Sequence, residues 1–314
     1  MGRKSLVRRP DRLAVGLAVV LLALANATPA AAARRPHSNG RGTPIGNDVS
    51  YPQCASKLPA SPAFGIVGVN GGLANDLNAC LGPSASYPSY SQSELYWSVS
   101  SSVGGSTQPP TSLYVNTADP GNEYGGSAIA DWPTSSSTSD PYNACVTTTI
   151  STTNGSQTVG ADSNACAWQY GYNKAAQDAL WLTQAARAID AQSPPAEVAS
   201  SPAAYPWWLD VESSNTWQAG SAGESMNVAD LQGMVAGLAD NGVTIVGVYS
   251  TAAQWDQVTG GTRPASASLY GLPDWIPGAR SLSQAEANCT LSSFTGGVVA
   301  LTQWTGRLDY DYSC

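Results

Sequence analysis

The chain has 314 residues, of which only 11% are charged, and its 22 acidic and 14 basic residues give a formal net charge of -8. Residues 1–33 contain five of the basic residues and one of the acidic residues, so the remainder carries a net charge of -12. A surface this acidic repels phosphate backbones, which excludes nucleic acid as an expected partner. The low charge and the ten Trp favour a protein that binds a neutral polar ligand.

The N-terminal segment has the order of a secretory signal: basic residues, an apolar run over 13–25, then small residues over 27–33. The apolar run is shorter than the roughly 20 residues that span a membrane. We therefore expect residues 1–33 to be a signal peptide, cleaved near Ala31 to Ala33. Residues 34–44 are polar and rich in Gly and Pro, which predicts a disordered leader. The protein is expected to be secreted, without a stable membrane anchor.

All six cysteines follow the predicted signal peptide. An even number in an oxidising compartment predicts three disulfides, of which fifteen pairings are possible. We expect sequential pairing, because each bond then closes a short loop within one local unit: Cys54 with Cys80, Cys145 with Cys166, and Cys289 with Cys314. No pair has Cys-x-x-Cys spacing and the single histidine, His37, lies in the leader, so neither a metal site nor a cofactor is expected.

The first half of the remaining chain predicts strands at 45–50, 63–70 and 113–117, of which 63–70 is the most apolar and β-branched. Residues 73–81 have helical spacing. Ser91-Gln92-Ser93-Glu94 has the form of a capping box and predicts a helix over 95–99. The segment from about 119 to 167 is rich in Ser, Thr, Gly and Asp and is expected to be an inserted loop. Such a loop is either an ordered functional wall or disordered, and the expected bond from Cys145 to Cys166 favours order.

The second half predicts helices over 172–191 and 227–240, and strands over 207–212, 243–250, 272–276, 298–304 and 308–311. Eight strands with intervening helices indicate an α/β fold, a TIM-like parallel (β/α) barrel with some helices missing in its last third and an insertion after its third strand. Residues 45–314 are expected to form this single domain. A doubly wound open sheet is the competitor, but no glycine-rich phosphate motif follows the first strand.

The strand over 207–212 ends in two carboxylates, Asp210 and Glu212. Strand side chains alternate between faces, so both acids point to the same side. They cannot both ionise freely, and the more desolvated one is expected to hold a proton near neutral pH. The alternative is that Asp210 caps the following turn and Glu212 is a solvated strand end, because perturbed carboxylate pairs mark function only probabilistically.

The residue types that the sequence lacks narrow the possible catalytic mechanisms. A serine or cysteine nucleophile normally needs a histidine base, and the chain past the signal peptide has only His37. The remaining candidates are carboxylates at strand ends that would meet at one barrel mouth: Asp48, Asp210, Glu212 and Asp309, with Asp311 as a fifth. Acids beside aromatic rings are what glycoside hydrolysis uses. We expect the substrate to contact Tyr249, Trp275, Trp304, Asn116, Trp208 and Asp311, although each tryptophan has core packing as its alternative.

The ordered motifs resemble glycoside hydrolase family 25, the lysozyme-type muramidases. The resemblance rests on Asn47-Asp48-Val49-Ser50, Trp208-Leu209-Asp210-Val211-Glu212, Val248-Tyr249-Ser250, Trp275-Ile276, Gln303-Trp304 and Leu308-Asp309-Tyr310-Asp311. It implies that Glu212 is the general acid, Asp210 its partner, and Asp48 and Asp309 further active-site carboxylates. The chain departs from the family at residues 114–116, where an aromatic-His-aromatic run is usual, and in its insertion.

The expected function is that of a secreted, monomeric glycoside hydrolase acting on peptidoglycan or a related N-acetylated glycan. A catalytically inactive barrel that binds cell-wall glycan is the alternative, because a fold does not guarantee an activity. A hydrolase of another polysaccharide is a third possibility. Loss of activity in Glu212→Gln without unfolding distinguishes the enzyme from the binding protein.

Overall fold

The computed structural model describes residues 44–71, 74–122, 131–137, 140–152, 155–261 and 268–314. The expected signal peptide (1–33) and nearly all of the expected leader (34–44) lie outside these ranges. The chain divides into two units, Met1–Asn39 and Gly40–Cys314, and every described residue belongs to the second. In the described part of the chain, no helix combines the length and the apolar character that crossing a membrane requires.

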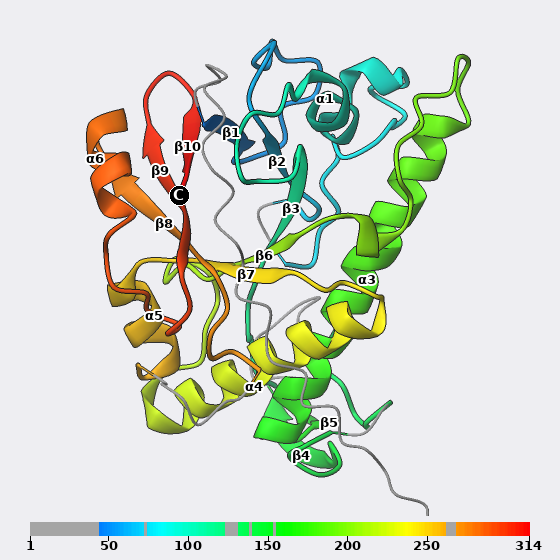
Figure 1. Ribbon diagram of the computed structural model, residues 1–314. Helices are drawn as coiled ribbons and strands as arrows, with labels where there is room; N and C mark the ends of the chain where they lie inside the picture. The colour runs from blue at the N-terminus through cyan, green and yellow to red at the C-terminus, as the bar shows by residue number, and fades with distance from the viewer. Residues whose placement is uncertain (1–43, 72–73, 123–130, 138–139, 153–154, 262–267) are drawn as a thin grey trace, which may run out of the picture. The chain divides into compact units, whose positions relative to one another are not determined.

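Eight strands form a closed barrel in the order β1-β10-β9-β8-β7-β6-β3-β2 (Figure 1). All eight occur where the apolar, β-branched runs predict strands. Their bounds are β1 (Ile45–Val49), β2 (Gly65–Gly68), β3 (Thr111–Asn116), β6 (Trp207–Asp210), β7 (Val246–Tyr249), β8 (Asp274–Ala279), β9 (Val299–Thr305) and β10 (Asp309–Ser313).

The barrel is mixed, which corrects the expectation of an all-parallel sheet. Strand β10 runs antiparallel to both of its neighbours, β9 and β1, whereas the other strand pairs are parallel. The reason is the connection from β9 to β10, which consists of residues 306–308 and is closed by a bond from Gly306 N–H to Leu308 O. A parallel crossover needs about a dozen residues or more, so a link this short forces a hairpin.

Helices connect most of the parallel strands: α1 (Glu94–Ser101), α3 (Asn164–Asp190), α4 (Gly220–Asp240), α5 (Ala252–Thr259) and α6 (Leu282–Asn288), with single 3-10 turns η1 (Tyr90–Gln92) and η2 (Pro202–Ala204). The helices α5 and α6 of the last third are short rather than missing, and the β9–β10 hairpin has no helix. Helices α3 and α4 pack so closely that a Cβ at Gly233 would lie 1.9 Å from Trp168 O.

The helix expected over 73–81 is wrong. Residues 74–81 form turns, and Leu77 makes an isolated bridge to Asn70. Asn78 explains the difference, because its side chain donates to Gly68 O at 2.8 Å and accepts from Cys80 N–H at 2.8 Å. Such side-chain bonds to the backbone compete with helical hydrogen bonding.

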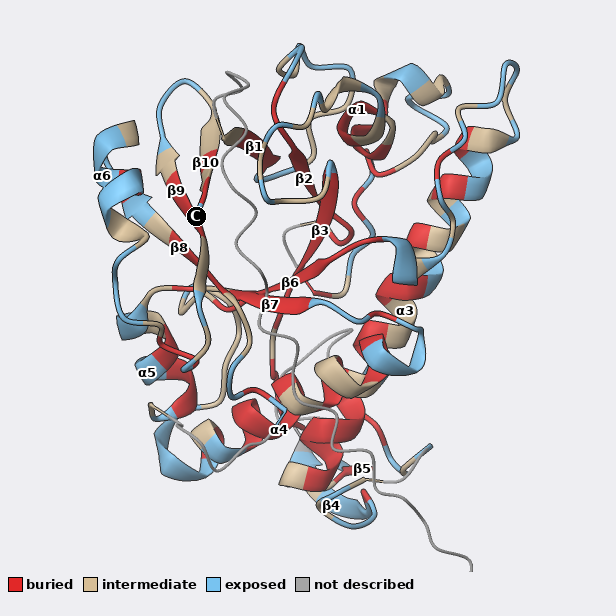
Figure 2. Ribbon diagram, in the orientation of Figure 1, coloured by how far each residue is buried: buried red, intermediate tan, exposed pale blue. Residues whose placement is uncertain are grey.

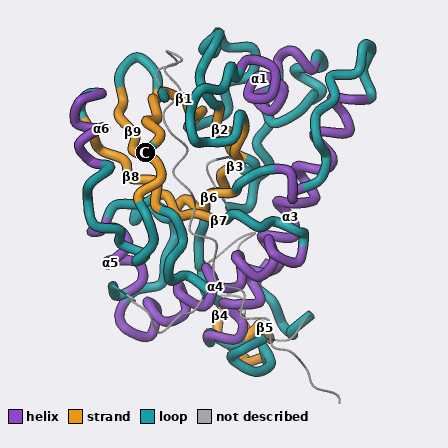
Figure 3. The backbone as a smooth tube through the Cα atoms, in the orientation of Figure 1, coloured by secondary structure: helices purple, strands orange, loops and turns teal. Residues whose placement is uncertain are grey.

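Helix α1 forms where it was expected, but Glu94 does not act in the predicted capping box. It is fully buried and accepts hydrogen bonds from Gln53 N–H at 2.6 Å and Asn78 Nδ2 at 2.7 Å. Burial raises the pKa of Glu94 to about 7, while these two bonds lower it. The carboxyl group therefore joins the loops on either side of β2, which Figure 3 shows as long segments without regular structure and which the Cys54–Cys80 disulfide also connects.

Strands β2, β3 and β6 are buried along their whole length, and so on both faces (Figure 2). In β6, Trp207 and Leu209 face outward into the core beneath the helices, whereas Trp208 points into the barrel. Inside the barrel Trp208 packs among Phe64, Ile66, Tyr114, Trp275 and Leu301. Gly247 makes room for it, since a Cβ there would lie 2.3 Å from the Trp208 ring.

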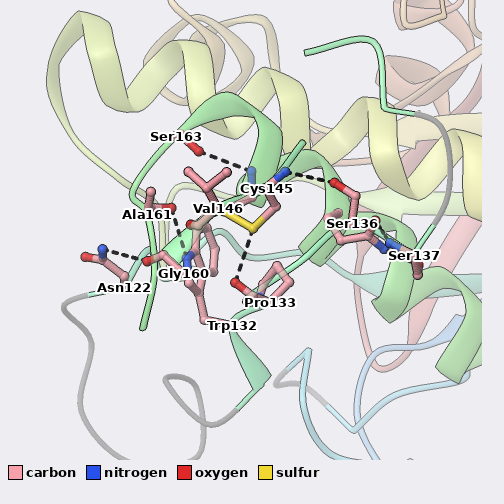
Figure 4. The surroundings of a disulfide bond; sticks show 12 residues. Asn122, Trp132, Pro133, Ser136, Ser137, Cys145, Val146, Gly160, Ala161 and Ser163 are labelled. Atoms are coloured by element: carbon pink, nitrogen blue, oxygen red, sulfur yellow. Dashed lines mark hydrogen bonds between the residues drawn. A yellow bond between two sulfur atoms is a disulfide. The ribbon is translucent and has the colours of Figure 1, made fainter. Parts of the chain in front are cut away.

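The insertion after β3 is ordered over its described residues and contains a hairpin, β4 (Thr147–Thr152) with β5 (Gly155–Gly160). The sequence predicted a loop here. Figure 4 shows how the Cys145–Cys166 disulfide attaches this hairpin to the first turn of α3, with Asn122 Nδ2 donating to Gly160 O at 2.9 Å. All three disulfides have the predicted sequential pairing, including Cys289 with Cys314.

Candidate functional site

A cavity of about 530 Å³ lies at the carboxyl ends of the parallel strands. This volume is within the range of small-molecule pockets, about 300–1,000 Å³. Neighbouring strands bring one row of polar and aromatic side chains to this level, because Asn116 pairs with Asp210, Asp210 with Tyr249, and Tyr249 with Trp275. All four side chains line the cavity, together with Glu212, Asp48 and Gln303.

The backbone around Asp210 and Glu212 is held from both sides. Thr117 Oγ1 donates to Asp210 O at 2.6 Å, and Val211 N–H donates to Tyr249 O at 2.9 Å. Glu212 lies two residues past the end of β6, where its carbonyl accepts from Trp217 Nε1 at 2.8 Å. The two carboxylates thus lie in the cavity on a segment whose path is fixed by neighbouring strands and by its own turn.

Asp210 is the more buried of the two, with 7% of its surface exposed. Burial raises the pKa of Asp210 well above its usual range, and the nearby charges of Glu212 and Asp48 raise it further. Desolvation and like charges both disfavour the ionised form. The protonated form of Asp210 is therefore favoured, which is the direction that the sequence predicts for the more desolvated acid of the pair.

A second group of side chains surrounds Asp48. Gln303 Nε2 donates to Asp48 Oδ2 at 2.8 Å and Tyr249 OH donates to Gln303 Oε1 at 2.9 Å. Asp48 is also hydrogen-bonded to Asp311, which requires a proton between the two carboxyl groups. Burial and the charge of Asp309 raise the pKa of Asp48 to about 7. The pair therefore changes charge near neutral pH.

Asp311 does not face the cavity, contrary to its expected role in contacting substrate. It is fully buried, and its Oδ1 accepts from Trp275 Nε1 at 2.8 Å. Burial, followed by the charge of Asp48, raises the pKa of Asp311 well above its usual range. Asp311 thus lies behind Asp48 and Trp275 and orients both.

Asp309 lies beside the cavity rather than in it. It pairs with Asp48 across β1 and β10, and its carboxylate accepts from Ser50 Oγ at 2.6 Å and Thr305 Oγ1 at 2.8 Å. With Asp48 and Ser50 it lines a separate hollow of about 100 Å³. Three of the four predicted catalytic acids therefore share the main cavity, and the fourth acts on it through its charge.

Two predicted contact residues, Trp208 and Trp304, are not among the residues that line the cavity. Trp208 is deep in the barrel, at 5.8 Å from Trp275 between ring centroids. Trp304 stacks on Tyr310 with centroids 5.1 Å apart. Because strand side chains alternate, Gln303 points inward and Trp304 outward. Gln303, and not the predicted Trp304, is therefore the member of this pair that lines the cavity.

Several lining residues were not predicted from the sequence, among them Tyr114, Gln303, Asn75 and Tyr170. Alternation along β3 and β9 was the signal for the first two, since Tyr114 shares a face with Asn116 and Gln303 shares one with Leu301. Asn70 was also missed; its Oδ1 accepts from Asn116 Nδ2 at 2.9 Å and fixes that amide. No local pattern marks Asn75 or Tyr170, because they lie on the loop after β2 and on α3, which only the tertiary structure brings together.

Among the described residues, no group of three or more His, Cys, Asp or Glu side chains is arranged to hold a metal ion. The groups that the cavity offers are carboxyls, amides, hydroxyls and four aromatic rings, and its polar groups suit hydrogen bonding to hydroxyl and amide groups of a neutral ligand. Comparison of the chain with protein-family models, with curated proteins and with solved structures found no match.

Proposed function

We propose that the protein is a secreted glycoside hydrolase that cleaves peptidoglycan or a related N-acetylated glycan. The observation that carries this proposal is the meeting of Asp48, Asp210 and Glu212 in one cavity beside Tyr249 and Trp275. Glycoside hydrolysis needs one carboxyl group to protonate the leaving oxygen and another carboxylate to stabilise the cationic transition state or the attacking group. Environments that separate the pKa values of neighbouring acids are how such roles are divided.

In this proposal Glu212 is the general acid, because it is the less buried member of the pair and extends beyond the strand end. Asp210 and Glu212 interact, so the proton that they hold belongs to the pair. Asp210 holds that proton in the resting site and passes it to Glu212, which donates it to the leaving oxygen. Asp48, oriented by Gln303, supplies negative charge opposite the sugar as positive charge develops. Asn116 and Tyr249 bind amide and hydroxyl groups of the substrate, and Trp275 packs against a sugar face.

The ordered motifs that resemble glycoside hydrolase family 25 support the choice of substrate. We also propose that the mixed barrel is a variant of the TIM-like (β/α) barrel, in which the last strand is inverted. Its site lies at the carboxyl ends of the parallel strands, where such barrels carry their active sites. The three disulfides support export, since such bonds persist in oxidising compartments.

The experiment is hydrolysis of purified peptidoglycan, measured as new reducing ends. Glu212→Gln should abolish release while leaving the circular dichroism spectrum and melting temperature unchanged. Glu286→Gln is the matched control, because Glu286 is exposed on α6 and is not a cavity residue. Equal release by wild type and Glu212→Gln contradicts the assignment. Tight binding to peptidoglycan without new reducing ends favours the inactive glycan-binding protein instead.

A further inference from the structure

The cavity is not centred on the barrel. Its lining on one side comes from residues 74–76, 116–118 and 214–216, which follow β2, β3 and β6. From the opposite side, β7, β8 and β9 contribute one residue each, Tyr249, Trp275 and Gln303, all of them strand residues. The cavity therefore extends from the barrel axis toward the side where the insertion leaves β3.

Two side chains join across the outer end of this extension. Tyr170 on α3 donates from its hydroxyl group to Asn75 Oδ1 at 3.1 Å, and both residues line the cavity. Asn75 belongs to the loop after β2, whereas Tyr170 belongs to the helix that follows the insertion. The hydrogen bond therefore joins the loop after β2 to helix α3, and the two residues together form one continuous wall at this end of the cavity.

The end wall is held firmly from behind. Tyr170 is 1% exposed, and its ring centroid lies 5.3 Å from that of Trp132. Lys174 Nζ lies 5.3 Å from the same Tyr170 ring centroid. Cys166 is one helical turn before Tyr170, so the Cys145–Cys166 disulfide attaches the insertion at the base of the wall (Figure 4). A ring fixed by these contacts does not swing away to admit a ligand.

Hydrogen bonds also fix the start of the insertion, beside this end wall. Asp119 N–H donates to Thr216 O at 2.9 Å, and Gln218 Nε2 donates to Asp119 Oδ1 at 2.9 Å. These bonds connect the start of the insertion to the loop that follows Glu212. Pro120, which follows Asp119 directly, is buried and lines the cavity.

We infer that this end wall makes the cavity a pocket for the end of a glycan chain, so that the protein removes short units from chain ends and does not cut within chains. An enzyme that cuts within a chain must let the glycan continue in both directions from the cleaved bond. Here one of those directions meets Tyr170 and Asn75. The inference rests on the proposed function and specifies its substrate as a chain terminus.

The test is the size of the first products from long, linear N-acetylated glycan strands, measured by mass spectrometry at low conversion. Wild type should release mono- and disaccharides while the long strands persist. Asn75→Ala, which removes one half of the closing bond, should produce internal fragments of intermediate length. Tyr142→Phe is the control, because it removes a hydroxyl group of the insertion that bonds to Gln232 and is not a cavity residue.

The outcomes separate the two proposals. Intermediate fragments from wild type at the earliest times, with Glu212→Gln inactive, leave the hydrolase standing and overturn the chain-end inference. Short products from Asn75→Ala, unchanged from wild type, overturn the role of the wall. An absence of hydrolysis on every glycan overturns the proposed function and this inference together.

Discussion

Replacing Asp119 by Asn should flatten the dependence of stability on pH. Asp119 is fully buried; its Oδ1 accepts from Gly121 N–H and Gln218 Nε2, and its Oδ2 has no hydrogen-bond partner among the described residues. Burial raises the pKa of Asp119 from 3.8 to about 7, with a smaller contribution from the charge of Asp162, while the two hydrogen bonds lower it. The folded protein therefore favours the protonated form.

The sign of the change in stability with pH follows from proton linkage. A raised pKa gives stability that is fully present below the unfolded value of 3.8 and is lost as the pH rises through about 7. Between pH 5 and pH 7 the unfolded chain has released this proton and the folded protein has kept it. At about 1.4 kcal/mol per pH unit, the loss between pH 5 and pH 8 is about 3 kcal/mol. Asn does not titrate, so the substitution removes this loss.

The assay is urea unfolding of wild type and Asp119→Asn at pH 5 and pH 8. Whatever the substitution costs at pH 5, the variant should gain about 3 kcal/mol relative to wild type at pH 8. Other buried carboxyl groups are common to both proteins and cancel in this difference. Asp256→Asn is the control, because Asp256 is exposed in the folded protein. Parallel curves for wild type and Asp119→Asn would refute the reasoning.

Three further predictions concern the site and its insertion. Gln303→Met removes a hydrogen bond that lowers the pKa of Asp48, so the pH profile of kcat/KM should shift to higher pH. The control Gln257→Met, at an exposed position, should leave the profile unchanged. A shift to lower pH in Gln303→Met would contradict the role of Gln303 in lowering the pKa of Asp48. Trp304→Ala should leave glycan affinity in calorimetry unchanged, because its ring stacks outside the cavity, and a large loss would show that it touches ligand. Replacing both cysteines of the Cys145–Cys166 bond by Ser should lower the free energy of unfolding by about 3 kcal/mol, and a change below about 1 kcal/mol in urea titration would contradict its role.

Strand positions followed from the sequence because buried strands leave a strong local pattern. In β6 the alternation of Trp207, Trp208, Leu209 and Asp210 predicted which side chains share a face, and the structure has Trp208 on the inner face and its two neighbours on the outer one. In β9 the prediction chose Trp304 for its aromatic ring and its place near a strand end, whereas alternation places Gln303 on the inner face. The face on which a strand residue lies can be predicted reliably only where a buried neighbour fixes the register of the strand.

The helix expected over 73–81 failed for a different reason. Its spacing was helical, but Asn78 bonds to the backbone of β2 and to Glu94, and Cys80 is joined to Cys54. These partners are distant in sequence, so no local pattern could reveal them. The same limit explains why Asn75 and Tyr170 were missed at the site. Tertiary contacts overrode local propensity in both cases.

The direction of β10 decides which of its two acids lies at the rim of the barrel. In a parallel last strand, Asp311 would lie nearer the mouth than Asp309, because the carboxyl ends of the parallel strands form the mouth. The short link over residues 306–308 inverts the strand, so that Asp309 pairs with Asp48 at the rim and Asp311 lies two residues deeper, bonded to Trp275 and to Asp48 from within. Asp311, whose pKa is raised by burial, is therefore sealed from solvent. Because the connection has only three residues, Asp311 does not reach the cavity. It lies behind Asp48 instead and supports it as a buried carboxyl group whose protonated form is favoured.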